Sequence, residues 1–448
     1  MDNSLKFFGT DGIRGKYGDK IINEDFAYSF GIAWGKYLET KNCDKSLPVF
    51  LARDTRHSGR KLLLACQTAL KENGFFAHSL DILPTPALAF TVCNEGALGG
   101  IMITASHNPH YDNGLKIISN KGGKLGFYDE SLIESFIIPS TPDIDYASPQ
   151  KIHSDRPAYI NRYIENLSLH FDPKFLLGLN IVVDLANGAT KEITPRALEC
   201  FGANVIPLNR GEGLINDQVG SEYVAGLSKH VVEEKADLGI AHDGDGDRVV
   251  FVDKYGNEIN GDKILGILAI HASKQGLLTE SKFVATVHSN SGLEYALRDK
   301  DICLYRSDVG DRNVFSLMEE TNSNWGGESS GHIICSDYMN TGDGLFSALS
   351  VLKCIKESQQ DLTTLSDEIT LWPSKSSGIL IKNKIPIKEF KELHEYLQYI
   401  KKELAANARV LIRYSGTEPK LRVLVEALDA NLADKIFEKV QKLVKKHI

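Results

Sequence analysis

The feature that most constrains the fold is a repeated alternation of short apolar runs with longer amphipathic stretches. In its first copy, apolar runs at 47–51, 76–80 and 99–103 alternate with amphipathic stretches at 59–74 and 85–94. Short runs rich in β-branched residues predict strands, and longer amphipathic stretches predict helices. Their alternation predicts an α/β domain built on a parallel or mixed sheet.

The same alternation recurs twice further along the chain. The second copy predicts strands at 180–184, 204–208 and 237–241 and a helix at 189–201. The third copy predicts strands at 282–287 and 302–305, helices at 292–299 and 312–320, and a last apolar segment at Trp325. Three α/β domains of similar plan are therefore expected.

The last part of the chain has a different pattern, which predicts a smaller α+β domain. Strands are expected at 378–381, 409–412 and 421–426, and helices at 387–404 and 432–447. Trp372-Pro373-Ser374 predicts a linker before it, which could act as a hinge. The chain has 448 residues, and at about 100–200 residues per domain we expect four domains, covering residues 1–154, 155–255, 256–370 and 371–448.

Charge and composition exclude some functional classes. The formal net charge of −8 argues against a nucleic-acid partner but does not exclude small anionic substrates. No apolar run approaches the roughly 18–20 residues of a membrane helix, and residues 1–15 carry no signal-peptide pattern. The seven cysteines form no CxxC pair, and we expect reduced core residues. A cytoplasmic monomer or homodimer is expected, with no membrane partner.

The first segment that carries chemistry follows the predicted strand at 99–103. Residues 104–109 read TASHNP, and residues 111–116 read YDNGLK. The hydroxyl of Ser106, the imidazole of His107 and the amine of Lys116 together predict a nucleophile loop. A polar turn without chemistry is an equally good interpretation of this segment alone.

The second segment, residues 243–248, reads DGDGDR and follows another predicted strand. Hard oxygen ligands at this spacing are typical of a divalent cation site, because carboxylates this close repel one another unless they are neutralised. An EF-hand is excluded, since its sixth and twelfth positions are Arg248 and Lys254 rather than Gly and Glu. A solvated acidic turn is the alternative.

Two further segments offer groups that suit a sugar phosphate. Residues 326–332 read GGESSGH, and Glu328 and Ser330 could bind sugar hydroxyls, although a structural loop explains the segment equally well. Residues 413–419 read RYSGTEP, which could form a nest for an anion or a surface turn. The chain has no GKS or GKT element and no dinucleotide fingerprint, which argues against a P-loop nucleotidase and an NAD enzyme.

These four segments, in this order and spacing, resemble the α-D-phosphohexomutase superfamily. Residues 8–15, FGTDGIRG, are a fifth match. The motifs at 184–189 (DLANGA), 309–312 (VGDR) and 415–419 (SGTEP) are most similar to the bacterial phosphoglucosamine mutases within that superfamily. The resemblance covers essentially the whole chain. It implies three similar α/β domains and a smaller C-terminal α+β domain, in a heart-shaped molecule with a central cleft.

The resemblance also implies a role for each candidate site residue. Ser106 would be the phosphoserine, and its phosphate would bind one Mg²⁺ together with Asp243, Asp245 and Asp247. The groups expected around the reacting phosphoryl group are Lys116, His107, Arg14 and Arg248. The groups expected to bind the sugar are Glu328, Ser330 and His332, and those expected to bind its non-reacting phosphate are Arg413, Ser415, Gly416, Thr417 and Arg422.

The activity that the resemblance implies is an isomerisation by phosphoryl transfer. Glucosamine 6-phosphate and glucosamine 1-phosphate would be interconverted through phospho-Ser106 and a sugar bisphosphate, which would also act as activator. Such a reaction feeds the synthesis of UDP-N-acetylglucosamine and cell-wall precursors. The alternatives are a phosphomannomutase/phosphoglucomutase of the same superfamily and a non-catalytic sugar-phosphate sensor. The intact serine, aspartates and lysine argue against a sensor, which could lose them freely.

Overall fold

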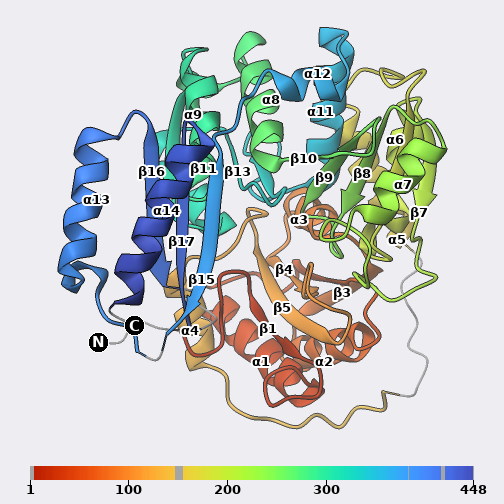
Figure 1. The fold of residues 1–448 in the computed structure, drawn as a ribbon. Helices are drawn as coiled ribbons and strands as arrows, with labels where there is room; N and C mark the ends of the chain where they lie inside the picture. The colour runs from red at the N-terminus through yellow and green to blue at the C-terminus, as the bar shows by residue number, and fades with distance from the viewer. Residues whose placement is uncertain (1–4, 147–154, 382, 415–418, 447–448) are drawn as a thin grey trace. The chain divides into compact units, whose positions relative to one another are not determined.

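The computed structural model describes residues 5–146, 155–381, 383–414 and 419–446. Contacts between Cα atoms divide the chain into two compact units. The first unit comprises the chain up to His288 together with Asp301–Asp367, and the second comprises Ser289–Lys300 together with the chain from Glu368 onward. Three mixed sheets form in the first unit, and a smaller antiparallel sheet forms in the second (Figure 1).

The first sheet has the strand order β1-β5-β4-β2-β3. Three neighbouring strands run parallel, and β5 and β1 then continue the sheet in antiparallel fashion. The strands are β1 (Ile13–Lys16), β2 (Pro48–Arg53), β3 (Phe76–Ile82), β4 (Gly99–Ile103) and β5 (Asp112–Ser119). The helices of this region are α1 (Glu24–Thr40), α2 (Gly59–Glu72), α3 (Thr85–Asn94) and α4 (Phe127–Ser135).

The second sheet, β10-β9-β8-β6-β7, repeats this plan strand for strand. Here β7, β6 and β8 are parallel, and β9 and β10 are antiparallel. The strands are β6 (Asn180–Asp184), β7 (Asn204–Leu208), β8 (Leu238–His242), β9 (Val249–Asp253) and β10 (Glu258–Ile259). The helical segments are α5 (Arg156–Leu167), η1 (Ala189–Lys191), α6 (Ile193–Cys200) and α7 (Ala225–Glu233).

The third sheet, β12-β11-β13-β14, has the same plan with one strand fewer. Its strands are β11 (Lys282–Thr286), β12 (Cys303–Ser307), β13 (Trp325–Gly327) and β14 (Ile333–Cys335), of which β14 is the antiparallel one. The helical segments of this region in the first unit are α8 (Gly261–Lys274), η2 (Thr279–Ser281), α10 (Asp311–Thr321), α11 (Gly344–Ser358) and α12 (Leu362–Asp367). Three α/β domains of similar plan are thus confirmed, and their sheets are mixed.

One loop occupies the same place in all three sheets. It joins the last parallel strand in chain order to its antiparallel neighbour, and connects β4 to β5, β8 to β9, and β13 to β14. Each loop therefore lies at the carboxyl end of a parallel strand, where α/β folds bind their ligands. The segments predicted to carry the chemistry at 104–109 and 243–248 lie in two of these loops, and the segment predicted at 326–332 comprises the end of β13 and the third loop.

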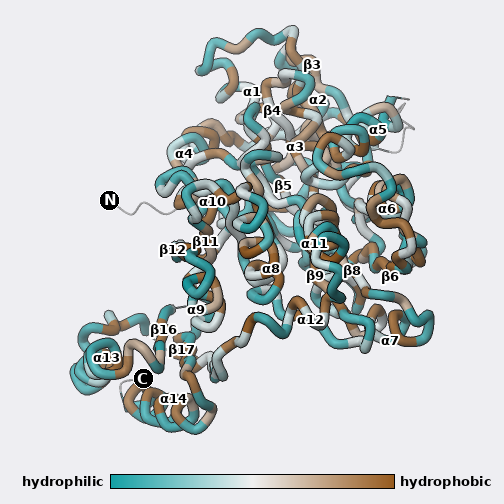
Figure 2. Tube along the Cα trace, turned by 90° about the horizontal axis from the view of Figure 1, so that it is seen from above, coloured by the Kyte–Doolittle hydropathy of each residue, from teal (hydrophilic) through white to brown (hydrophobic). Residues whose placement is uncertain are grey.

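The second unit contains the sheet β15-β17-β16 and a hydrophobic core of its own. Its strands are β15 (Ser374–Leu380), β16 (Ala408–Tyr414) and β17 (Lys420–Ala427), and its helical segments are α9 (Ser291–Arg298), η3 (Ile387–Glu389), α13 (Lys391–Glu403) and α14 (Ala430–Lys445). Hydrophobic and hydrophilic residues alternate around the turns of α14 (Figure 2), and its buried positions Ile436, Val440 and Val444 pack into this core.

Two predicted helices are wrong in being continuous. The stretch at 189–201 divides into η1 and α6 at Glu192. Pro195 has no N–H to donate to the carbonyl of Lys191, so the ladder of a single helix cannot form there, whereas the first turn of a new helix tolerates proline. The stretch at 387–404 likewise begins with the separate turn η3 before α13.

The prediction that the cysteines are core residues is only partly right. All seven are free, but only Cys66, Cys335 and Cys354 are buried. Cys93, Cys200 and Cys303 lie at exposed ends of helices or strands, and Cys43 is half-buried in the connection between α1 and β2, positions that sequence context alone does not reveal. Among the described residues, no helix combines the length and the apolar character needed to cross a membrane.

Candidate active site

Ser106 lies in the loop between β4 and β5, with its side chain directed at the second sheet. Its Oγ donates a hydrogen bond to Asp243 Oδ2 at 2.6 Å, and His107 Nδ1 lies 3.4 Å from Ser106 Oγ. Ser106 is fully buried and has a φ of 52°, a left-handed conformation that is uncommon for serine. A strained and buried hydroxyl beside a carboxylate is typical of a functional position rather than of a polar turn.

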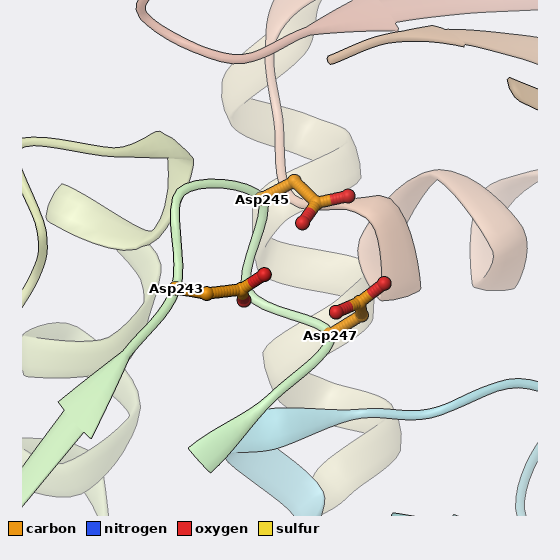
Figure 3. A group of neighbouring side chains, drawn as sticks. All are labelled: Asp243, Asp245 and Asp247. Atoms are coloured by element: carbon orange, nitrogen blue, oxygen red, sulfur yellow. The ribbon is translucent and has the colours of Figure 1, made fainter. Parts of the chain in front are cut away.

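The loop between β8 and β9 brings Asp243, Asp245 and Asp247 together. All three are buried, and each offers a carboxylate oxygen within 4.8 Å of the others. Figure 3 shows the three carboxylates close to one another, all carried by this one loop. Gly246, with a φ of 77°, makes this tight turn possible, and its N–H donates to Asp243 Oδ1 at 3.1 Å. The alternating glycines therefore position the carboxylates.

The electrostatics of this cluster are those of a cation site. Burial raises the pKa of Asp243 well above its usual range, and the nearby carboxylates of Asp247 and Asp245 raise it further. Asp245 Oδ1 and Asp247 Oδ1 are buried without a hydrogen-bond partner in the described part of the chain. Three converging carboxylates with two such oxygens are a donor set that fits a hard divalent cation such as Mg²⁺.

Lys116 on β5 places a positive charge beside the carboxylates of the cluster. Its Nζ lies 2.8 Å from Asp245 Oδ2, 3.1 Å from Asp247 Oδ2 and 2.9 Å from Asp11 Oδ2. Burial lowers the pKa of this lysine, but the three carboxylates outweigh burial and hold it well above its usual range. Lys116 is therefore a fixed cation, which offsets part of the cluster's negative charge.

A network of ion pairs extends from Asp11 across the first unit. Asp11 binds Arg14 and Lys124 as well as Lys116, and Lys124 also lies 2.5 Å from Asp311 Oδ2. Asp11, Lys124 and Asp311 were not predicted as site residues. Asp11 and Asp311 fall inside the matched motifs at 8–15 and 309–312, which could have drawn attention to them. No local pattern marks Lys124.

The basic groups predicted around Ser106 lie close to it. Arg14 Nη1 donates to Asn108 Oδ1 at 3.3 Å, within the Ser106 loop. The backbone N–H of Arg248 donates to Asp243 Oδ1 at 3.2 Å. Burial, together with the positive charges of Arg248 and Arg14, lowers the pKa of His107 to about 3, so this imidazole is neutral at physiological pH.

The loop between β13 and β14 approaches the acidic cluster through His332. His332 Nδ1 lies 3.7 Å from Asp247 Oδ1, while its Nε2 accepts a hydrogen bond from the N–H of Gly342 at 3.1 Å. Glu328 Oε1 accepts a hydrogen bond from the N–H of Gly310 at 3.0 Å, and Ser330 is exposed. Glu328 and Ser330 are thus partly accessible, as groups that bind a ligand should be.

The last predicted segment lies in the second unit. Arg413 on β16 and Arg422 on β17 are directly opposite each other in the antiparallel register, so their side chains share one face of the sheet. Two like charges in this position favour binding of an anion. Ser415, Gly416 and Thr417, predicted to complete the phosphate site, lie outside the described residues.

The first unit therefore brings together the buried hydroxyl of Ser106, a buried carboxylate cluster and several cations. Asp243 links this hydroxyl to the cluster, Lys116 on β5 contacts the cluster, and His332 links it to the loop between β13 and β14. Transfer of a phosphoryl group requires positioning and neutralisation of charge more than covalent chemistry by the protein. The geometry is suited to that reaction.

Comparisons with known proteins agree with this geometry. Models of the phosphoglucomutase/phosphomannomutase family match the chain in four successive parts: alpha/beta/alpha domain I at residues 5–141, domain II at 157–256, domain III at 260–371 and the C-terminal domain at 380–443. A phosphoglucosamine mutase of Nitratiruptor sp. is 38% identical over 450 residues, which covers 99% of this chain and 100% of the relative. One of Haemophilus influenzae is 40% identical, covering 98% and 99%.

Solved structures share the fold at lower identity. A phosphoglucomutase/phosphomannomutase family protein of Burkholderia thailandensis has a TM-score of 0.81 and 22% identity, covering 98% of this chain and 97% of that one. The N-acetylphosphoglucosamine mutase of Aspergillus fumigatus, whose structure holds GlcNAc-6P and magnesium, has a TM-score of 0.64 and 16% identity, covering 99% and 96%.

Proposed function

The chain belongs to the phosphoglucomutase/phosphomannomutase family, and we propose that it interconverts glucosamine 6-phosphate and glucosamine 1-phosphate. The activity is that of a phosphosugar mutase, an isomerase that acts on a sugar phosphate. The amino sugar is indicated by identities of 38–40% to phosphoglucosamine mutases over nearly the full length. The observation that carries the chemistry is Ser106 Oγ, which lies 2.6 Å from a carboxylate of the acidic cluster.

In the proposed reaction, Ser106 is phosphorylated in the active protein and acts as both donor and acceptor. The bond from Ser106 Oγ to phosphorus breaks as a sugar hydroxyl forms a new bond to phosphorus, and the proton that this hydroxyl loses ends on Ser106 Oγ. The sugar bisphosphate then turns end for end, and its other phosphate returns to Ser106. Each cycle therefore ends with Ser106 phosphorylated again. If the sugar bisphosphate escapes, Ser106 is left without its phosphate, and added sugar bisphosphate would restore it and so act as an activator.

The chain's own residues provide most of the positioning and charge for this step. Asp243, Asp245 and Asp247 would hold Mg²⁺ together with the phosphate on Ser106, and the bound ion would neutralise charge on the phosphoryl oxygens. Lys116 holds the carboxylates in place from the side of β5. Arg14 and Arg248 carry positive charge next to the Ser106 loop, near enough for both to lower the pKa of His107, and charge on the transferred group would develop there.

Binding of the substrate is proposed to divide between two regions. Glu328 and Ser330 would bind sugar hydroxyls, with His332 between them and the acidic cluster. Arg413 and Arg422, with Ser415, Gly416 and Thr417, would bind the phosphate that does not react. Because the sugar must bind in both orientations, binding in this second region should depend on contacts with the phosphate rather than with the sugar ring.

A comparison of substrates tests the proposal. One preparation is assayed with the 6-phosphates of glucosamine, glucose and mannose, and the mass of the intact protein is measured before and after reaction. We expect the highest kcat/KM with glucosamine 6-phosphate and the mass of one phosphate on Ser106, which is absent from Ser106→Gly. A higher kcat/KM with glucose or mannose phosphate would instead make the protein a phosphoglucomutase or phosphomannomutase.

A further inference from the structure

Arg56, in the turn after β2, is a charged side chain that none of the predicted motifs includes. It is among the largest fully buried side chains, and its guanidinium is completely shielded from solvent. Its Nε lies 2.9 Å from Asp54 Oδ2, so the charge is paired. A buried ion pair contributes little net stability compared with apolar residues of similar size, which indicates that Arg56 serves another purpose.

The guanidinium of Arg56 binds the backbone of the Ser106 loop. Nη2 donates to the carbonyl oxygens of Ser106 at 2.9 Å and Asn108 at 2.8 Å, and Nη1 donates to those of Asp112 at 2.9 Å and Pro109. One planar group thus holds four carbonyls of a single short loop. A lysine could not reproduce this pattern, because its ammonium is a point charge without the fixed fork.

The Arg56–Asp54 pair also reaches Ser106 from its N–H side. Asp54 Oδ2 accepts a hydrogen bond from Thr104 Oγ1 at 2.6 Å, and Thr104 Oγ1 accepts one from the N–H of Ser106 at 2.9 Å. Both ends of the peptide around Ser106 are therefore tied to one ion pair. This arrangement holds the serine in its left-handed conformation, which the backbone would not adopt readily by itself.

Asn216, from the loop after β7, supports the same carbonyls from the second sheet. Its Nδ2 donates to the carbonyl oxygens of Ser106 at 2.7 Å and Asn108 at 3.0 Å. Each of these oxygens thus has two donors, which fixes its direction. Carbonyl oxygens held by these donors are kept from turning toward the reacting phosphoryl group, whose negative charge they would repel.

We propose that Arg56 is a positioning residue for the phosphoryl transfer, and that Asn216 assists it. This inference rests on the proposed function, because it assigns Arg56 the task of holding Ser106 Oγ in line for donation and return of the phosphoryl group. Arg56 acts through the loop and does not touch the reacting atoms. Its loss should slow the transfer step while leaving the affinity for sugar phosphate nearly unchanged, because misplacement of a reacting group lowers the rate rather than the binding.

The test compares Arg56→Lys with the matched substitution Arg53→Lys. Arg53, on β2, is also ion-paired, to Asp81 at 2.7 Å, but it is only part-buried, and among the described residues it contacts no carbonyl of the Ser106 loop. Steady-state kcat is divided by the phosphorylated fraction of Ser106, obtained from the intact mass, and thermal unfolding shows how much of each variant is folded. The substrate is whichever hexose phosphate the wild-type protein turns over fastest, so a failure of the amino-sugar assignment does not affect this test.

We expect kcat of Arg56→Lys to fall about 100-fold with KM changed less than about threefold, while kcat of Arg53→Lys stays within about twofold of wild type. Asn216→Gly, which suits the left-handed φ of 57° at this position, should lower kcat about tenfold. A folded Arg56→Lys with the kcat of Arg53→Lys would overturn the inference. If Arg56→Lys does not fold, Asn216→Gly decides, and an unchanged kcat in that variant overturns it.

Discussion

The two regions proposed to handle phosphate are built in opposite ways. The transfer region in the first unit is buried, with Ser106, Asp243 and Asp245 fully shielded from solvent. In the second unit, Arg413 is only half-buried and Arg422 is exposed. A reacting group requires charges fixed in a water-excluded site, where they act most strongly. A phosphate that is only bound, and that exchanges places with the reacting phosphate when the sugar turns, requires positive charge in an accessible site instead.

This difference suggests that the two regions affect different kinetic quantities. Interactions made only with the reacting group change kcat, whereas interactions made equally in the ground state and the transition state change KM. The transfer region should therefore control kcat, and the two arginines should control KM. Substitutions in each region test that division, beginning with the largest expected effect.

Removal of the nucleophile should have the largest effect. Ser106→Gly should lower kcat by at least about 10⁴-fold, because it removes the hydroxyl proposed to carry the phosphoryl group between the two ends of the sugar. Glycine is preferred to alanine here, since it adopts the φ of 52° without strain. Turnover is measured in the coupled mutase assay, with thermal unfolding as the control for folding. Retention of a tenth of the wild-type kcat would remove Ser106 from the mechanism.

Loss of the metal site should have the next largest effect. Asp245→Asn should lower kcat by about 10²–10³-fold, since a bound metal ion contributes several kcal/mol of transition-state stabilisation. In the wild-type protein, chelation should abolish turnover and added Mg²⁺ should restore it. The matched control is Asp184→Asn, another buried carboxylate, which binds backbone and Asn209 donors outside the cluster. Equal dependence on Mg²⁺ in all three proteins would contradict ligation by Asp245.

In the second unit, Arg413→Ala should raise KM by about 10–100-fold with kcat changed less than about threefold. That range corresponds to the roughly 1.5–3 kcal/mol of a hydrogen bond to a charged group. Arg422→Ala should have a similar but smaller effect, because Arg422 is more exposed. The control is Lys375→Ala, which removes a cation of the neighbouring strand β15 that pairs with Asp434. A fall in kcat at constant KM would erase the distinction between the two regions.

The smallest effect concerns the internal stability of the second unit. Buried Glu426 on β17 accepts hydrogen bonds from the N–H of Ser291 at 3.0 Å and from its Oγ at 2.6 Å, so α9 is tied to the C-terminal sheet. Ser291→Ala should lower the free energy of unfolding of this unit by about 1–2 kcal/mol while turnover stays within about twofold.

Hydrogen exchange of the amides in β16 and β17 measures the effect of Ser291→Ala. Ser135→Ala, which removes an exposed hydroxyl at the end of α4, should leave that exchange unchanged.

The linker hypothesis at Trp372–Ser374 is tested by the same data. Trp372 is buried. Its backbone N–H donates a hydrogen bond to Asn290 Oδ1, and its carbonyl oxygen accepts one from Asn290 Nδ2 in the same unit. If the amides of both α9 and the C-terminal sheet exchange faster in Ser291→Ala than in the wild-type protein, these two parts unfold together.

The sequence by itself determined the fold class, and it predicted which three loops carry the candidate site residues. The predicted bounds of α3, β4, β6 and β7 agree with the structure, because each is an apolar segment with Gly, Pro, Asn or Asp at one or both of its ends. The acidic cluster was predicted from spacing alone, since three carboxylates alternating with glycine can only be accommodated in a tight turn. Local pattern is sufficient where a residue's role depends on its neighbours in the chain.

Tertiary structure alone decided which distant residues complete the site. Lys124 and Arg56 have no local signature, and the motif that contains Asp11 does not reveal its partners; each acquires its role from residues distant in the chain. The placement of α9 with the C-terminal sheet, although it lies between β11 and β12 in the chain, depends on the buried contact of Ser291 with Glu426. Such pairings arise because a buried charge must find a partner within a few ångströms, wherever the fold happens to bring one.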